Sequence, residues 1–154
     1  MFKVCFNRLL NMYTFEVIDP NSKEDIAFLY NLIINKLDNI SNNKKPSFEE
    51  HRHFVENHPY KEWYKVNFKD VKVGTFYLSK VNTIGINLKS DNYKTYMEVL
   101  KKIFLEYKPD PEINSIRNKH FTINSSPTNQ VLIKALKELG LELIQETYIY
   151  RDIK

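Results

Sequence analysis

The stretch NTIGINLKSDNYKTYMEVLKKIFLEY, residues Asn82–Tyr107, decides the fold of this protein. Its first residues predict a buried strand at Thr83–Lys89, and a short polar loop leads from that strand into an amphipathic helix. Many proteins hold a phosphate with the free N–H groups at such a helix start. The loop contains no glycine, however, and glycine usually lets a backbone approach a phosphate closely. The chain therefore either binds a phosphorylated cofactor without those glycines or has kept only the scaffold.

The composition is that of one globular domain. Of the 154 residues, 42% are hydrophobic and 14% aromatic, and a chain of this length buries about two thirds of its unfolded surface in one core. No apolar run approaches the ~20 residues of a membrane span, and the first residues lack the features of a signal peptide. The single cysteine, Cys5, excludes an intrachain disulfide and fits a reducing compartment. We expect a soluble, cytoplasmic protein with no membrane partner.

The basic net charge raises the question of nucleic-acid binding. The formal charge is +4, and the lysines are spread along the chain rather than clustered. Phosphates and base edges are best bound by the guanidinium fork of arginine. The arginines among the 23 basic residues are only Arg8, Arg52, Arg117 and Arg151. We therefore expect a solvated basic surface and no nucleic-acid partner.

Apolar patterns and turn residues divide the chain into an ordered series of elements. Ser22 and Ser47 mark two helix starts, the second with Glu50 at capping-box spacing, and Gly140 marks a helix end. Short connections between three consecutive strands predict an antiparallel meander. We expect strands at 13–20, 62–69, 71–80, 82–89, 115–124 and 141–152, and helices at 21–40, 46–59 and 125–140 besides the one that ends at Tyr107. Because Met12 opens the first clean strand, we expect residues 1–11 to be an N-terminal extension and residues 12–154 to be a single domain.

This order of elements resembles that of the GCN5-related N-acetyltransferase (GNAT) superfamily from Tyr13 onward. The segment PSFEEHRHFVENHPYKEWYKVNFKDVKVGTFYL is similar to one in sugar-nucleotide and ribosomal-protein acetyltransferases, with their S-x-E-E-H helix and G-x-x-x-L strand. INSSPTNQVLIKALKELGLE resembles their closing pattern of an Asn, a helix and LGF. The resemblance implies an α+β (α/β) fold with a central mixed, mostly antiparallel sheet of about six strands, flanked by four helices.

The resemblance also implies a cosubstrate, acetyl-CoA, in a cleft between splayed fourth and fifth strands. In that family the pantetheine pairs with the fourth strand, here Ile86, Asn87 and Leu88, and the pyrophosphate rests on the start of the third helix. The corresponding residues at that helix start are Asn92, Tyr93, Lys94 and Thr95. An Asn of the last helix contacts the coenzyme in the family, and Asn129 matches it. Asn129 is also placed to cap an orphan N–H at the start of its helix.

Three positions depart from the family pattern. Tyr96 stands where a glycine or alanine permits close approach to the phosphates, and Asp91 puts a negative charge where Gln or Arg would face them. Leu136 stands where many members have the Tyr that protonates the leaving thiolate. Lys94 and Thr95 offer a positive point charge and a hydroxyl, which offset part of this loss of phosphate contacts. The pyrophosphate loop is therefore degenerate, and retained coenzyme binding and an ordinary polar helix start both stay open.

Candidate catalytic residues are few. Histidine titrates near neutrality, and helix spacing turns His51 inward beside Phe54 and Val55, so His51 is the candidate base, with a buried or capping histidine as the alternative. Asn124 and Ser125, at the end of the predicted fifth strand, are candidates for hydrogen bonds near the thiol, although such residues also form loops. His51, His53 and His58 diverge on a helix, so we expect no metal site.

Two functions from different classes fit these residues. The first is an acyl-CoA-dependent N-acyltransferase, foremost an N-acetyltransferase, that acts on a small-molecule amine such as an amino sugar. The second is a catalytically inactive GNAT-fold protein that binds a partner or ligand. The FEEH segment and the strand-four cleft favour the enzyme, whereas the missing glycines and the missing Tyr favour the inactive protein. The oligomeric state, including a dimer, stays open.

Overall fold

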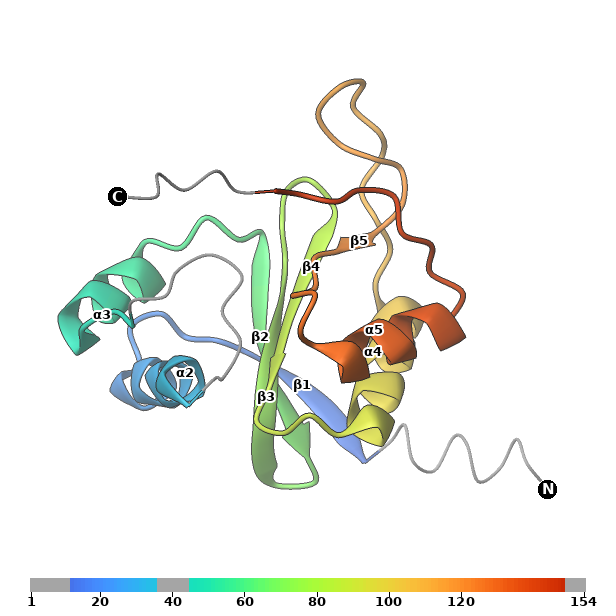
Figure 1. Ribbon diagram of the computed structural model, residues 1–154. Helices are drawn as coiled ribbons and strands as arrows, with labels where there is room; N and C mark the ends of the chain where they lie inside the picture. Colours follow the sequence, from blue (N-terminus) through green and yellow to red (C-terminus); the bar gives the residue numbers. More distant parts are fainter. Residues whose placement is uncertain (1–11, 36–44, 149–154) are drawn as a thin grey trace, which may run out of the picture.

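The computed structural model of the chain describes residues 12–35 and 45–148. Within these residues a five-stranded sheet, in the order β1-β2-β3-β4-β5, carries α2 and α3 on one face and α4 and α5 on the other (Figure 1). We call these the α2 face and the α4 face. The strands are β1 (Tyr13–Val17), β2 (Glu62–Phe68), β3 (Val71–Leu78), β4 (Thr83–Leu88) and β5 (Thr122–Ile123), and the helices are α2 (Lys23–Ile34), α3 (Phe48–Glu56), α4 (Tyr93–Glu106) and α5 (Gln130–Glu138).

The sheet is mixed, as predicted, with four antiparallel strands and one short parallel one. β1 to β4 pair antiparallel with their neighbours, which confirms the predicted meander of β2, β3 and β4. Lys69 and Asn82 make the two tight connections with φ of 53° and 61°, the left-handed region that turns require. β4 then pairs in parallel with β5 through only two residue pairs, Thr83 with Thr122 and Ile84 with Ile123.

Three of the helix ends lie where the sequence marks them, although α2, α3 and α5 are shorter than the expected ranges 21–40, 46–59 and 125–140. The Ser22 hydroxyl accepts the Asp25 N–H, and Ser47 and Glu50 form both bonds of the predicted capping box. Gly140 has φ of 82°, a conformation that side chains with a Cβ rarely adopt, and it follows α5 directly. Each of these signals involves residues that lie close together in the sequence, so the helix ends could be predicted without the tertiary structure.

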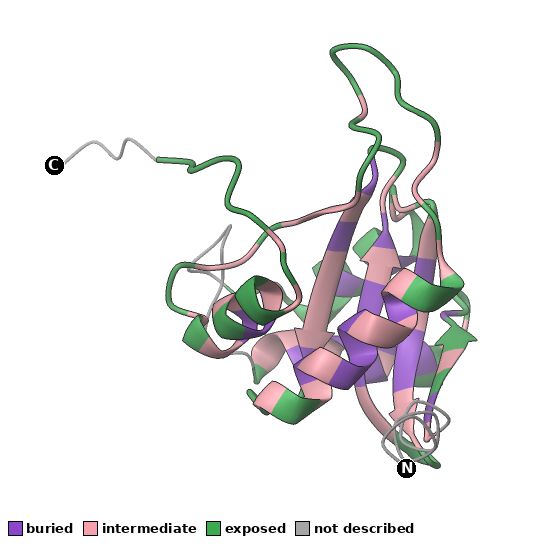
Figure 2. Ribbon diagram, turned by 90° about the vertical axis from the view of Figure 1, so that its right-hand side faces the viewer, coloured by how far each residue is buried: buried purple, intermediate pink, exposed green. Residues whose placement is uncertain are grey.

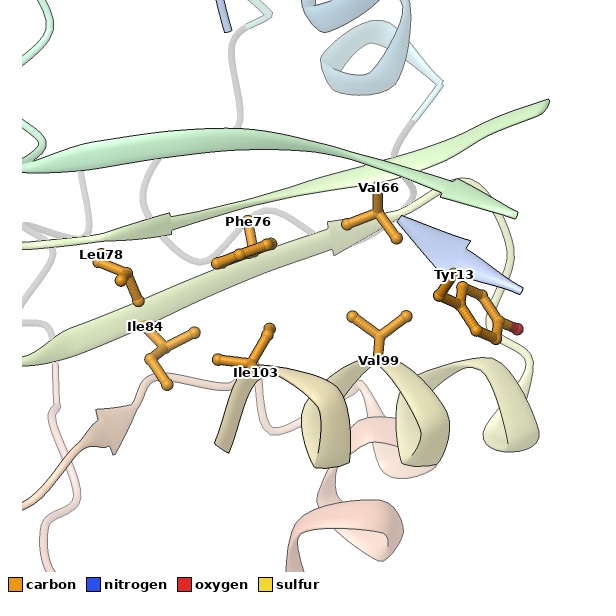
Figure 3. Packing of buried hydrophobic residues seen from close by; sticks show 7 residues of the cluster. All are labelled: Tyr13, Val66, Phe76, Leu78, Ile84, Val99 and Ile103. Carbon is orange, nitrogen blue, oxygen red and sulfur yellow. The ribbon is translucent and has the colours of Figure 1, made fainter. Parts of the chain in front are cut away.

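The main core lies between the sheet and α4. Side chains of alternate strand residues, among them Val66, Phe76 and Ile84, meet Val99 and Ile103 of α4 (Figure 3). All five are fully buried, and burial of each contributes about 1.5–3 kcal/mol relative to exposure. In Figure 2 buried residues run along the central strands, whereas the long loop after α4 and the C-terminal segment are exposed. This packing fixes the end of β4 and the start of α4 relative to one another.

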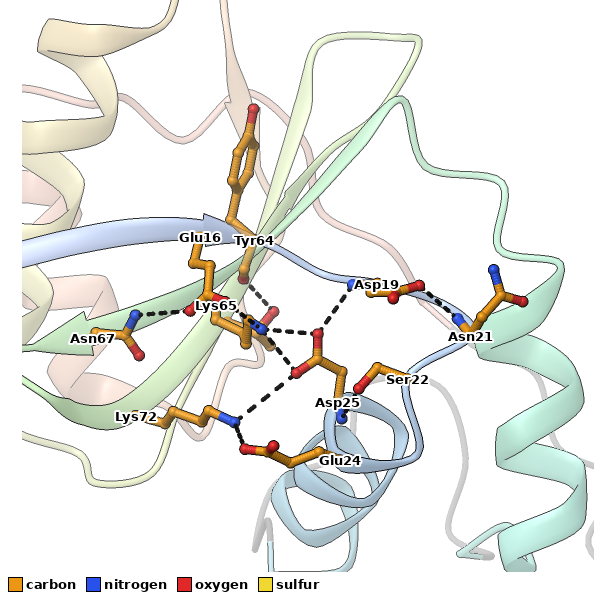
Figure 4. A network of polar contacts seen from close by, with 11 residues as sticks. Glu16, Asp19, Asn21, Ser22, Glu24, Asp25, Tyr64, Lys65, Asn67 and Lys72 are labelled. Atoms are coloured by element: carbon orange, nitrogen blue, oxygen red, sulfur yellow. Dashed lines mark hydrogen bonds and ion pairs between the residues drawn. The ribbon is translucent and has the colours of Figure 1, made fainter.

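The α2 face combines an apolar cluster with a buried ion pair. Lys65 of β2 and Asp25 of α2 are 5% and 3% exposed, and the Lys65 ammonium donates to both Asp25 oxygens at 2.8 Å and contacts Glu16 at 2.9 Å (Figure 4). The Asp25 carboxylate also accepts the Asp19 N–H at 3.0 Å. Burial opposes the charge of Lys65, but the bonds to Asp25 and Glu16 outweigh it and raise the Lys65 pKa. The network joins β1, α2 and β2.

Two strand predictions were wrong. Of the strand expected at 115–124 only Thr122–Ile123 forms, because Ser115 takes a left-handed φ of 63° and the charged and polar residues after it are exposed. The strand expected at 141–152 is absent from 141–148, the part that the structure describes, where Leu143 and Tyr148 are 78% and 85% exposed. A strand forms only beside a neighbour that pairs with it. The described sheet therefore has five strands instead of about six.

None of the helices within residues 12–35 and 45–148 has the length and apolar character needed to cross a membrane.

Candidate functional site

The edge of β4 is open beyond its first two residues. After Ile84 the chain of β5 leaves through Asn124 and Ser125 toward α5, so in the described residues Gly85–Leu88 pair only with β3. An unpaired strand edge presents a row of N–H and C=O groups that an extended ligand can bond. The pairing of β4 with β5 thus stops after two residue pairs, at the place where a splay between the fourth and fifth strands was predicted.

A cavity of about 280 Å³ lies between this open edge and α2 and α3. The helices contribute its apolar side, with residues Leu29, Leu32, Ile33 and Phe54. The sheet and the adjoining loops contribute the aromatic and polar remainder: Tyr60, Trp63, Thr75, Tyr77, Gly85, Ile86, Asn87 and Asn124. Three of the residues expected at a cofactor or catalytic site, Ile86, Asn87 and Asn124, therefore come together at one cavity.

Three aromatic rings form one wall of this cavity. Tyr60 and Tyr77 are stacked with centroids 3.7 Å apart, and Trp63 meets Tyr60 edge-on at 5.0 Å. A Cβ on Gly85 would lie 2.1 Å from the Tyr77 ring, so only glycine lets that ring rest on β4. The Trp63 indole N–H is buried and has no hydrogen-bond partner within the described residues.

The tyrosine hydroxyls of this wall remain protonated near neutral pH. Burial raises the pKa of both Tyr60 and Tyr77, and their hydroxyls also interact with one another. Neither hydroxyl is therefore a base for a substrate in the cavity. Thr75 is likewise occupied, since its hydroxyl donates to the Tyr64 carbonyl at 2.6 Å.

The start of α4 is partly occupied by its own cap. The Asn92 side chain accepts the Thr95 N–H at 3.1 Å, and the Asn92 carbonyl accepts the Tyr96 N–H at 3.1 Å. The N–H groups of Tyr93 and Lys94, in the first turn, have no intrahelical partner. Lys94 is exposed at this helix start, where the helix dipole also favours an anion. A phosphate would meet two amides and one ammonium there.

Tyr96 links the start of α4 to the start of α5. Its ring is buried between the two helices, and its hydroxyl contacts the Asp91 carboxylate at 3.4 Å and the Asn129 amide at 3.3 Å. The Asn129 side-chain oxygen accepts the Leu132 N–H at 2.9 Å and so caps α5. The side chain that replaces the family's glycine or alanine therefore joins two helix starts that the resemblance assigns to the coenzyme.

His51 lies elsewhere. It is 2% exposed, packs against the Tyr30 ring at 5.5 Å between α2 and α3, and is not among the residues that line the cavity. Burial lowers the His51 pKa in spite of a hydrogen bond to the Ile26 carbonyl. This position is that of a histidine packed between helices. A catalytic role for His51 stays a prediction.

The remaining predicted residues divide between the cavity and other contacts. Asn124 is exposed at the cavity, whereas the Ser125 hydroxyl donates to the Ser126 carbonyl at 3.2 Å. Leu88 points to the α4 face and packs in the cluster of Tyr96 and Leu100. Among the described residues no three His, Cys, Asp or Glu side chains are placed to hold a metal ion.

The aromatic wall of the cavity was not predicted from the sequence. For Trp63, Tyr64, Phe76 and Tyr77 the sequence favours sheet core over a sugar-stacking surface. Tyr64 and Phe76 pack in the core of the α4 face, and Trp63 and Tyr77 pack in the apolar cluster of the α2 face, where they also line the cavity. Successive strand residues point to opposite faces. That alternation was the available signal, because it places one residue of each neighbouring aromatic pair on the α4 face and the other on the α2 face, beside the cavity.

No protein-family model and no curated protein matches this sequence. Solved structures that are similar to the chain include the following two. An integron cassette protein from the mobile metagenome of V. cholerae has a TM-score of 0.57 at 13% identity, over 91% of each chain. A possible acetyltransferase from Clostridium difficile 630 has a TM-score of 0.51 at 10% identity, over 93% of this chain and 99% of the other. At these identities the likeness shows the fold alone, and the α+β architecture is consistent with a GNAT-like fold.

Proposed function

We propose that this protein is an acyl-CoA-dependent N-acyltransferase that moves an acetyl group from acetyl-CoA to a small amine. The observation that carries the proposal is the open edge of β4 beside the cavity, with the start of α4 following only a short loop later. One of the two similar structures is a possible acetyltransferase, which supports the same reaction class.

The coenzyme would lie along the backbone of Ile86, Asn87 and Leu88, with its phosphates near Tyr93, Lys94 and Thr95. The residues present fit this in charge and donors: two free amides, the Lys94 ammonium and the dipole of α4 all favour an anion. The Asp91 carboxylate opposes it but is engaged by the Tyr96 hydroxyl. Asn92 would border the phosphates and Asn129 the pantetheine arm.

The reaction needs an uncharged amine, a polarised carbonyl and a stabilised thiolate. The amine nitrogen bonds to the thioester carbon, the carbon–sulfur bond breaks, the nitrogen loses a proton and the thiolate gains one. Asn124 and Ser125 are the polar residues nearest the end of β5 that can hydrogen-bond the sulfur side. The resemblance to sugar-nucleotide acetyltransferases makes amino sugars one candidate class of acceptor, and the lining of the cavity bears on that choice.

A second candidate function is a catalytically inactive protein of the same fold that binds a ligand or partner. It is favoured by Tyr96, which fills the space between the two helix starts, and by Leu136 in place of a general acid. The two candidates differ in one measurable property, the binding of coenzyme A.

Calorimetric titration with acetyl-CoA tests the proposal. We expect saturable binding that the Lys94→Glu variant weakens about tenfold or more, because a charge-assisted bond worth about 1.5–3 kcal/mol is lost. The control is Lys108→Glu, an equal charge change at an exposed site beyond the far end of α4, which should keep the affinity. No binding at millimolar acetyl-CoA would end the acyltransferase proposal and leave the inactive protein.

A further inference from the structure

Among the described residues that line the cavity beside β4, none carries a group that is charged near neutral pH. Its lining residues are aliphatic, aromatic, glycine, threonine and asparagine, with no Asp, Glu, Lys, Arg or His among them. The hydroxyls of Thr75, Tyr60 and Tyr77 are already engaged with neighbouring groups. Apart from the open backbone edge of β4, the free polar groups of the lining are therefore the side-chain amides of Asn87 and Asn124.

This lining disfavours a cationic ligand. A primary aliphatic amine is an ammonium ion at neutral pH, and moving an ion from water into an apolar site without a partner charge costs several kcal/mol. Within residues 12–35 and 45–148 the lining offers no carboxylate to pair with the ion and no histidine to take its proton. An amino sugar also carries several hydroxyls, more than Asn87 and Asn124 can satisfy.

The same lining suits a flat apolar group. Tyr60, Tyr77 and Trp63 present ring faces and edges on one side, and Leu29, Leu32 and Ile33 present aliphatic surface on the other. Aromatic rings gain from offset or edge contacts with such a wall.

We infer that the cavity takes an uncharged amine carried on a flat aromatic body, an arylamine in chemical class, as the acyl acceptor. The role as acceptor rests on the proposed acyltransferase function, whereas the class of ligand rests on the cavity itself. An arylamine nitrogen is already neutral at physiological pH, so no protein base is needed before attack. The nitrogen then bonds to the thioester carbon as the carbon–sulfur bond breaks, and one proton passes from the nitrogen to the departing sulfur.

Trp63 supplies the readout, because it is the single tryptophan of the chain. The ¹⁵N-labelled full chain therefore gives one indole N–H signal in a proton–nitrogen correlation spectrum, and this signal reports on the cavity without any turnover. The probes are p-toluidine, which is neutral at pH 7, benzylamine, which has nearly the same shape but is protonated, and glucosamine. We expect p-toluidine to shift the signal saturably, and benzylamine and glucosamine at equal concentration to leave it in place.

Two variants check that the shift arises in the cavity. Ile33→Phe adds a ring to the lining and should weaken p-toluidine binding about tenfold or more, whereas Leu105→Phe adds the same ring at an exposed site of α4 and should not. Asn87→Asp keeps the side-chain shape and adds a carboxylate that pairs with an ammonium ion, so this variant should bind benzylamine. This nearly isosteric variant keeps the test valid if Ile33→Phe fails to fold.

The outcomes separate the two proposals. Equal shifts of the Trp63 signal with p-toluidine and with benzylamine in the unaltered protein would overturn the inference that the ligand is uncharged. No shift with any amine would overturn the cavity as the acceptor site, even where acetyl-CoA binds. A p-toluidine response without acetyl-CoA binding in calorimetry would overturn the acyltransferase function and support the ligand class alone.

Discussion

At the scale of single residues, the buried ion pair of Lys65 and Asp25 is the feature of the α2 face that depends most on the presence of both partners. Desolvation of two charges is costly, and their attraction repays it only when the geometry is good and the other bonds are satisfied. Both conditions hold, since Lys65 contacts Asp25 and Glu16, and Asp25 also accepts the Asp19 N–H. Such a pair tolerates the loss of one member poorly.

Replacing Lys65 by methionine should therefore destabilise the protein by about 3–5 kcal/mol, because the Asp25 carboxylate is left buried without its cation. The measurement is the free energy of unfolding from urea denaturation. Lys134→Met is the control at an exposed ion pair: the side chains of Lys134 and its partner Glu138 are 66% and 49% exposed, so the change should cost about 0–1 kcal/mol. Similar losses in both variants would show that burial of the pair is not the reason.

His51 makes stability depend on pH. Its folded-state pKa lies below the ordinary value of 6.5 because burial outweighs the bond to the Ile26 carbonyl. The unfolded chain therefore takes up a proton first, and stability should be lost as the pH falls below about 6.5, by up to 1.4 kcal/mol per pH unit. Burial lowers the His58 pKa as well, so His58 adds a further loss of stability as the pH falls.

The His51→Phe variant should reduce this loss, since a phenyl ring in the same place takes up no proton. The measurement is the free energy of unfolding at about pH 8 and about pH 5.5 for both proteins. An unchanged difference between the two pH values would mean that His51 does not carry the effect.

At the scale of elements, the start of α5 is set by Asn129. Its side-chain oxygen caps the helix at the Leu132 N–H while its amide reaches the Tyr96 hydroxyl. Asn129→Ala should cost about 0.5–2 kcal/mol of stability. Asn129→Ser keeps a capping oxygen on a shorter side chain, so it should restore most of that stability.

Acetyl-CoA titration of the same two variants separates the cap from a coenzyme contact. If Asn129 only caps the helix, both variants should bind with unchanged affinity per folded molecule. If it also contacts the coenzyme, both should bind more weakly by about 0.5–1.5 kcal/mol. Unchanged stability and unchanged binding in both variants would contradict either role.

At the scale of the whole molecule, the described fold begins at Met12, whose carbonyl accepts the Lys69 N–H at 2.7 Å, and its first strand begins at Tyr13. We expect residues 1–11 to be dispensable, so that their deletion leaves the free energy of unfolding unchanged. Urea denaturation and size-exclusion chromatography of both forms measure this. Aggregation of the shortened chain alone would show instead that these residues protect a sheet edge.

The sequence by itself determined the elements whose signals are local. Ser22 and the Ser47–Glu50 box mark two helix starts, and Gly140 marks a helix end. The strands of the meander were equally readable, because alternation and short turns report the sheet face directly. The order of these elements carried the resemblance from which the α+β fold and the splayed fourth strand were expected.

Only the tertiary structure decided which residues form the site. Phe76 packs in the core of the α4 face, whereas its neighbour Tyr77 packs against the apolar cluster of the α2 face and also lines the cavity, and only the positions of the helices decided this difference. Lys65 paired with a carboxylate 40 residues away, a partner that no spacing reveals. The segment 141–148 has a strand-like sequence but no neighbouring strand in the described fold. Strand pairing, burial and charge pairing depend on which residues are neighbours in space, whereas a single sequence shows only which residues are neighbours along the chain.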